Sequence, residues 1–225
     1  MIKFEHTQVF NFEGAFRGAR NPMNSWHLSD SYCTEDGEFR IGEKDMDLAK
    51  RLIKGGTDHR KFLRQIIVSV DITAPRYWWP EFDTYKISTV ANSCSTMHKI
   101  HERELTIDDF SLEQCDELTR NVYEKHIIPT FNYFRNLYNE ADKKLKREDL
   151  TKAERKHVTA QRKYYWKQLI LLLSQSYNQK RTVTMNYENL RNMYHGRQNH
   201  KLDEWSVGFM EWIDSLPYAD ELIKC

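Results

Sequence analysis

The sequence has few of the residues that break secondary structure or cross-link a chain. Its 225 residues include only five prolines, eight glycines and four cysteines. This scarcity of proline and glycine favours a helix-rich fold with some strands. The cysteines are widely scattered, with no Cys-x-x-Cys or zinc-site spacing, at Cys33, Cys94, Cys115 and Cys225. We therefore expect reduced thiols in a cytoplasmic protein.

Net charge and long apolar runs are also lacking. The 34 lysines and arginines nearly balance 33 acidic residues, so the formal charge of +1 predicts no general attraction to nucleic acid or a membrane surface. The longest apolar run, Leu169 to Leu173, is too short to span a bilayer. The first residues carry no apolar segment typical of a secretory signal. The apolar fraction of 40% is sufficient for one domain over residues 1–225.

Hydrophobic periodicity predicts an α+β fold that is mostly helical. Apolar residues alternate from about Gln65 to Thr73, which predicts a strand with one buried face that ends at Ala74-Pro75. Ser111 with Gln114, and Thr151 with Glu154, can form capping boxes. Helical spacing predicts helices over residues 44–54, 111–144 (with a kink or break at Pro129), 151–173, 187–195 and 202–216.

Chemical motifs are sparse. The sequence contains neither a phosphate-binding glycine loop nor a Gly-x-Ser-x-Gly elbow. His98 and His101 can share one helical face, but no third ligand accompanies them, so no metal site is predicted. Residues 88–96 are rich in short hydroxyl and amide side chains. Such a loop suits a planar ligand with phosphates, and it is equally typical of a polar connection between core elements.

The segments LAKRLIKGG, TDHRKF, Ala74-Pro75 and residues 92–98 follow one another in an order that resembles the flavin-dependent thymidylate synthases. In that family a helix ends near a His-rich turn, a strand enters Ala-Pro, and an aromatic helix with Arg-His-Arg precedes a loop Asn-Glu-x-Ser-x-Arg-Tyr. Here the matching segments are LAKRLIKGG, TDHRKF, Ala74-Pro75 and the loop from Asn92 to His98. Further matches are Arg17-Gly18-Ala19-Arg20, Thr184-Met185-Asn186, Leu190-Arg191-Asn192 and Arg197. The resemblance covers nearly the whole chain and implies a central antiparallel or mixed sheet with long helices.

The resemblance also implies ligands and roles. The cofactor is FAD, the substrate a pyrimidine deoxynucleotide such as dUMP, and the co-substrates are methylenetetrahydrofolate and NADPH. His59, Asn186 and Asn192 match residues near the flavin, Ser95 and Arg197 match nucleotide-binding residues, and Ser95 and Lys86 are the candidates for a catalytic role. Each of these side chains has a surface or capping role as its alternative. A homo-oligomer, in the family a tetramer with active sites between subunits, is also implied.

The departures from the family pattern concern its charged residues. Thr84-Tyr85-Lys86 stands where the family has Arg-His-Arg, and Ser93 and Met97 replace the loop glutamate and arginine. Ile170 stands where the family has a phosphate-binding arginine. Arg60, Lys61 and Arg64 are candidates to compensate for the lost charges.

Two functions follow from this pattern. The first is methylation, or hydroxymethylation, of the pyrimidine base. The alternative is a non-catalytic descendant that binds a nucleotide or a partner. The aromatic runs Tyr77–Trp79 and Tyr164–Trp166 would serve such a descendant as interaction surfaces, although core packing is their expected role.

Overall fold

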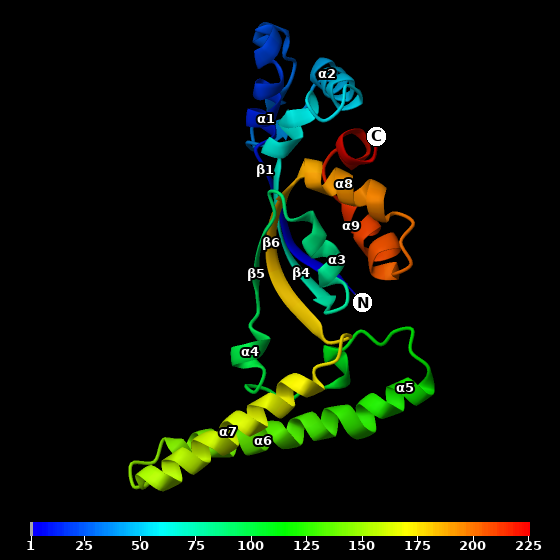
Figure 1. The fold of residues 1–225 in the computed structure, drawn as a ribbon. Coiled ribbons are helices and arrows are strands. Elements are labelled where there is room, and N and C mark those ends of the chain that lie inside the picture. Colours follow the sequence, from blue (N-terminus) through cyan, green and yellow to red (C-terminus); the bar gives the residue numbers. More distant parts are fainter. Residues whose placement is uncertain (1) are drawn as a thin grey trace. The chain divides into compact units, whose positions relative to one another are not determined.

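In the computed structural model, which describes residues 2–225, most strands precede a long series of helices and the last strand follows it (Figure 1). The strands are β1 (Lys3–Phe10), β2 (Tyr32–Cys33), β3 (Phe39–Arg40), β4 (Ile67–Pro75), β5 (Val90–Ser93) and β6 (Asn178–Asn186). The α-helices are α1 (Phe12–Ala19), α2 (Glu43–Lys54), α3 (Trp79–Phe82), α4 (Thr96–Lys99), α5 (Glu117–Val122), α6 (Ile128–Leu145), α7 (Lys152–Leu172), α8 (Tyr187–Arg197) and α9 (Met210–Asp214). Short 3₁₀ helices include Arg60–Gln65 and Asp83–Tyr85, and π-helical turns include Tyr123–Ile127 and Glu204–Phe209. The predicted α+β class is confirmed.

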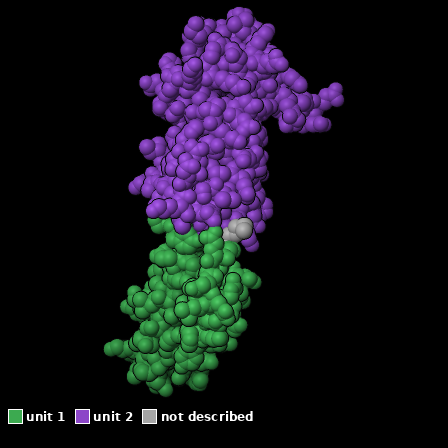
Figure 2. Space-filling view, turned by 90° about the vertical axis from the view of Figure 1, so that its right-hand side faces the viewer, with its two compact units in different colours: residues 1, 74–80, 93–180 green, residues 2–73, 81–92, 181–225 purple. Residues whose placement is uncertain are grey.

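The chain folds into two compact units (Figure 2). Unit 1 contains residues 74–80 and 93–180, and unit 2 contains residues 2–73, 81–92 and 181–225. The chain passes from one unit to the other within β4, β5 and β6. The single domain over residues 1–225 stays a prediction. None of the helices among residues 2–225 is both long and apolar enough to cross a membrane.

A four-stranded sheet has the order β1-β4-β6-β5. Strands β1 and β4 pair antiparallel, with Lys3 opposite Thr73 and Phe10 opposite Ile67. Within unit 2, one face of β4 is fully buried through Val68, Val70 and Ile72, as the period-two alternation predicts. The register fixes this face, because a shift by one residue would expose all three side chains.

Unit 2 packs its C-terminal segments against the sheet through aromatic rings. The Phe4 ring of β1 stacks on Trp212 of α9 with centroids 4.5 Å apart. Phe209, in the π-helical turn before α9, packs against both rings at 6.1 and 5.5 Å. Such pairs add to the free energy gained from burying the ring area.

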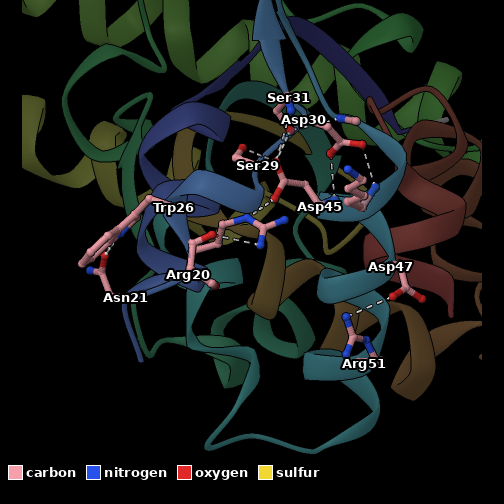
Figure 3. Close-up of polar contacts among 12 residues, drawn as sticks. Arg20, Asn21, Trp26, Ser29, Asp30, Ser31, Asp45, Asp47 and Arg51 are labelled. Atoms are coloured by element: carbon pink, nitrogen blue, oxygen red, sulfur yellow. Dashed lines mark hydrogen bonds and ion pairs between the residues drawn. The ribbon is translucent and has the colours of Figure 1, made fainter. Parts of the chain in front are cut away.

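A buried ion pair joins the end of α1 to α2 in unit 2 (Figure 3). Arg20 Nε donates to Asp45 Oδ1 at 2.5 Å, and the hydroxyls of Ser29 and Ser31 donate to Asp45 Oδ2. Burial raises the pKa of Asp45, but the hydrogen bonds from the two serines and Arg20 outweigh it, so the pKa of Asp45 lies below its ordinary value. Asp30 accepts the backbone N–H groups of the first turn of α2, so the helix predicted over residues 44–54 is capped as well as formed.

Unit 1 is built on an antiparallel pair of helices, α6 and α7, which lie side by side (Figure 1). Their buried residues, Phe131 and Leu169, join a core formed with Ile100, Leu105 and Phe110. The predicted Thr151–Glu154 capping box is present at the start of α7. The helices predicted over 151–173, 187–195 and 202–216 correspond to α7, to α8, and to α9 with the π-helical turn before it.

The start of the helix predicted from Ser111 is a correction. Helix α5 begins at Glu117, and Asp116 is its N-cap through a bond from the Thr119 N–H. Ser111 is extended instead, because its N–H donates to the Ser176 carbonyl and its hydroxyl donates to Asn178. Pro129 lies just after the π-helical turn Tyr123–Ile127, through which the helical backbone of α5 continues into α6, so the proline does not break the helix.

Candidate functional site

Helix α8 of unit 2 carries or contacts most of the predicted site residues. It begins where β6 ends, and Asn186 is its N-cap. The Asn186 side chain accepts the Asn189 N–H at 3.0 Å, while the Asn189 side chain accepts the Asn186 N–H at 3.4 Å. Both asparagines are buried. Asn186 therefore fixes the start of α8, which is the capping role left open by the sequence.

The turn before β4 places a cluster of cations against the first turn of α8. Arg60 Nε donates to Glu188 Oε1 at 3.1 Å, and Arg64 Nε lies 3.5 Å from Oε2 of the same carboxylate, which is only 8% exposed. Lys61 and His59 are exposed beside this pair. Lys61 forms no ion pair in the part of the chain that the structure describes. Arg60 and Arg64 thus share one buried carboxylate, and with Lys61 beside them this turn keeps an excess of positive charge even when Asp58 is counted.

The positive charges of this cluster also act on His195, further along α8. Burial and the positive charges of Arg191 and Arg60 lower the pKa of His195, against a hydrogen bond to the Cys225 backbone that raises it. Arg191 also donates to the Ile223 carbonyl. Asn192 is exposed on the same helix. This side of α8 is therefore suited to an anion.

The last residue of α8, Arg197, is held by residues from segment 81–85. Its Nε donates to the Tyr85 hydroxyl at 3.0 Å, and its Nη2 pairs with Glu81 Oε2 at 2.7 Å. The guanidinium carbon lies 5.4 and 5.5 Å from the ring centroids of Tyr85 and Trp205, within range of a cation–π interaction. A Cβ atom on Gly196 would lie 2.9 Å from the Tyr85 hydroxyl, so glycine permits this approach. Arg197 is only 17% exposed, and an internal carboxylate already neutralises it.

Further contacts fix the rest of this segment to unit 2. Asn189 Nδ2 donates to the Ile87 carbonyl at 2.7 Å, and Arg181 Nη1 contacts both carboxylate oxygens of Asp83 at 3.0 and 3.3 Å. Lys86 is exposed and forms no ion pair within residues 2–225. Of the substituted triplet, Tyr85 thus contacts Arg197, while Lys86 is exposed to solvent.

Ser95 belongs to unit 1, where it is the N-cap of the short helix α4. Its hydroxyl accepts the His98 N–H at 3.1 Å. It borders a hollow of about 100 Å³ together with Lys99 and Tyr177. Ile170, at the position of a family arginine, packs against the apolar core of unit 1. Packing accounts for the loss of charge at this position.

Asn186 and Arg197 lie at the two ends of α8. His59 and Lys86 are each next to a residue that contacts α8, Arg60 and Tyr85. Ser95 lies in unit 1. Glu81 and Trp205, which contact Arg197, were not among the residues predicted for the site. One signal was present for Glu81. It precedes Tyr85 by four residues in a helical stretch, a spacing that places two side chains on the same side.

The two aromatic runs have different environments, both in unit 1. Trp78 and Trp79 are buried with ring centroids 5.0 Å apart, so they are core residues as expected. Tyr165 and Trp166 are half-buried, whereas Tyr164 is 57% exposed. Among residues 2–225, no group of three His, Cys, Asp or Glu side chains is arranged to hold a metal ion.

Comparison with known proteins supports the fold. No family model and no curated protein matches the sequence. A crystal structure of the flavin-dependent thymidylate synthase ThyX from Helicobacter pylori, complexed with FAD and dUMP, matches with a TM-score of 0.60 and 17% identity over 100% of this chain and 98% of that chain. A second structure of ThyX from the same organism, with FAD and dUMP, matches with a TM-score of 0.58 and 17% identity over 99% and 96% of the two chains. The chain therefore has the fold of these flavin-dependent thymidylate synthases.

Proposed function

We propose that the protein binds FAD and a pyrimidine deoxynucleotide such as dUMP, and methylates or hydroxymethylates the base with a one-carbon unit from methylenetetrahydrofolate. One observation carries this proposal. The fold matches, over the whole chain, an enzyme whose crystal structure contains FAD and dUMP. NADPH is the proposed source of electrons. A cytoplasmic homotetramer is the proposed assembly.

The cationic turn of unit 2 fits the flavin dinucleotide. The pyrophosphate of FAD is anionic, and Arg60, Lys61 and Arg64 outnumber the acidic residues near them, Asp58 and Glu188. We assign His59 and the exposed Asn192 to the flavin as well, and Asn186 to the positioning of α8. When bound, FAD supplies the hydride-transfer chemistry, and the protein supplies binding and orientation.

Lys86 and Arg197 are the proposed nucleotide-binding residues of unit 2. Lys86 is exposed, and its ammonium can stabilise negative charge on a pyrimidine. Arg197 uses two of its five N–H donors on Tyr85 and Glu81, so further donors can receive a phosphate. Ser95 is assigned to the nucleotide through its hydroxyl, with a catalytic role shared with Lys86.

Three measurements on the purified protein test the proposal. A visible flavin spectrum after isolation, or after addition of FAD, is the first expected result. Calorimetric binding of dUMP to the flavin-loaded protein is the second. Transfer of a labelled carbon from methylenetetrahydrofolate to dUMP, with NADPH as reductant, is the third. Absence of flavin binding at saturating FAD would refute the proposed cofactor and the reaction together.

A non-catalytic nucleotide-binding protein is the second candidate, and the substituted charged triplet favours it. Thr84 and Tyr85 stand where the family has the first arginine and the histidine, so only Lys86 keeps a charge for an anionic pyrimidine. Arg197 still has N–H donors left for a phosphate. This candidate predicts that dUMP binds without any transfer of the labelled carbon, with or without NADPH. Label in the product would exclude it.

A further inference from the structure

Helix α7 of unit 1 carries four lysines that form no ion pair within residues 2–225. They are all exposed, at Lys152, Lys156, Lys163 and Lys167. At 3.6 residues per turn, these positions fall within an arc of about 60° on one side of the helix. With a rise of 1.5 Å per residue, the row extends over ~22 Å. We call these four residues the lysine row.

The other charged residues of α7 have structural roles. Arg155 donates to the carbonyls of Leu145 and Arg147 at 2.8 Å each, which closes the connection between α6 and α7. Arg162 pairs with Asp142 of α6 at 2.6 Å. Glu154, the one acidic residue of α7, forms the capping box. The lysine row therefore consists of the charged residues of α7 that have no structural contact of this kind.

The lysine row costs the helix stability. Lys152 and Lys156, like Lys163 and Lys167, are like charges four residues apart, and such pairs destabilise a helix by a few tenths of a kcal/mol. Lys152 also places a positive charge at the helix N-terminus, where the macrodipole is unfavourable to it. Residues 143–167 contain ten lysines and arginines against three acidic residues, a balance of +7 in a chain whose total is +1. The net charge of the whole chain is near zero and by itself predicts no attraction to nucleic acid. It does not show that positive charge is concentrated in residues 143–167.

Tyr164 adds an aromatic ring beside the row. It follows Lys163 directly, lies three residues before Lys167, and is 57% exposed. A lysine row for phosphates with an exposed ring for a base is the combination that single-stranded nucleic acids bind. An anionic membrane fits less well, because a helix that lies in a membrane surface needs an exposed apolar face. Of the valine, leucine and isoleucine side chains of α7 only Leu171 is exposed, whereas Val158 and Leu169 are buried in unit 1.

We propose that the lysine row and Tyr164 form a binding surface for single-stranded nucleic acid, in which the lysines contact phosphates and Tyr164 stacks on a base. The lysine row and Tyr164 include none of the residues assigned to FAD or dUMP, so the inference goes beyond the proposed function.

Fluorescence anisotropy with a labelled oligothymidine strand tests the proposal, in saturating dUMP to occupy any nucleotide site. Four phosphate contacts predict a slope of about −2.8 for log affinity against log KCl concentration, so a fourfold rise in KCl weakens binding about 50-fold. The double variant Lys163→Gln/Lys167→Gln should halve the slope to about −1.4. Its matched control is Lys50→Gln/Lys54→Gln on α2, an exposed pair with the same four-residue spacing, which should leave the slope unchanged.

Tyr164→Ala should weaken binding at least about fivefold at every KCl concentration without changing the slope, since stacking is not ionic. Tyr133→Ala, which removes a ring of α6 that is 60% exposed, is its control. Thermal melts verify that each variant is folded. An absence of strand binding by the unmodified protein, equal losses in both lysine pairs, or binding to anionic phospholipid vesicles without binding to the strand would each overturn the proposal.

Discussion

Replacement of Glu81 by glutamine tests how Arg197 receives a phosphate. Glu81 pairs with Arg197 at 2.7 Å and is 43% exposed, so the ion pair contributes only ~0.2–1 kcal/mol. A phosphate bound at the same guanidinium also experiences repulsion from the Glu81 carboxylate, roughly 1 kcal/mol where water screens the charges. Together these terms oppose nucleotide binding by about 1–2 kcal/mol, so Glu81→Gln should raise the affinity for dUMP about five- to thirtyfold.

Calorimetry with dUMP and with deoxyuridine separates the phosphate from the base. The gain should appear for dUMP only, because deoxyuridine has no phosphate to compete with Glu81. Asp83→Asn is the matched control, since Asp83 is 53% exposed and pairs with Arg181 instead. An equal gain for deoxyuridine, or no change for dUMP, would refute the assignment of Arg197 to the phosphate while leaving the flavin measurement unaffected.

Three further predictions concern stability. Asp45→Asn leaves the Arg20 guanidinium buried without a charge partner and should lower the free energy of unfolding, measured by chemical denaturation, by about 3–5 kcal/mol. The pKa of Asp45 is lowered in the folded state, so the stabilisation by its carboxylate is present above the unfolded pKa of about 3.9 and is lost as the pH falls through the lower folded value. The ring of His101 packs against Tyr138 with centroids 4.5 Å apart and planes tilted by 46°, and burial lowers the pKa of His101. The melting temperature should therefore fall as the pH drops below about 6.5, where the unfolded chain takes up the proton first, and a melt of His101→Phe should lack this dependence. Thr151→Ala removes the capping box of α7 and should cost ~1 kcal/mol in the same denaturation assay, whereas Thr159→Ala on the exposed part of that helix should cost less.

The elements of the fold follow from local patterns. The alternation around Val68 and Val70 identifies β4, and Thr151 with Glu154 identifies the start of α7, because both signals act within a few residues. Ser111 is the instructive failure. It has a capping-box partner at the right spacing, yet a distant segment at Ser176 and Asn178 binds it and keeps the chain extended. Tertiary hydrogen bonds of this kind have no local signature.

The candidate site was only partly predictable for a similar reason. Motif spacing marked Asn186 and Arg197, but the partners that decide their roles come from elsewhere in the chain. Glu81 forms an ion pair with Arg197 although the two residues are 116 positions apart, and Glu188 lies close to both Arg60 and Arg64. No sequence pattern indicated which carboxylate meets which cation. At Ile170 the residue type itself is informative, because an apolar side chain is typical of a position that packs against an apolar core.

The close approach of Tyr85 to Gly196 has a consequence for how this lineage can evolve. Any side chain at position 196 would push the Tyr85 hydroxyl away from Arg197, because a Cβ there would lie 2.9 Å from it. A shorter residue at position 85 would remove that restriction. We therefore expect the two positions to covary among natural relatives, with glycine at 196 wherever tyrosine occupies 85, and freer choice at 196 where 85 is small.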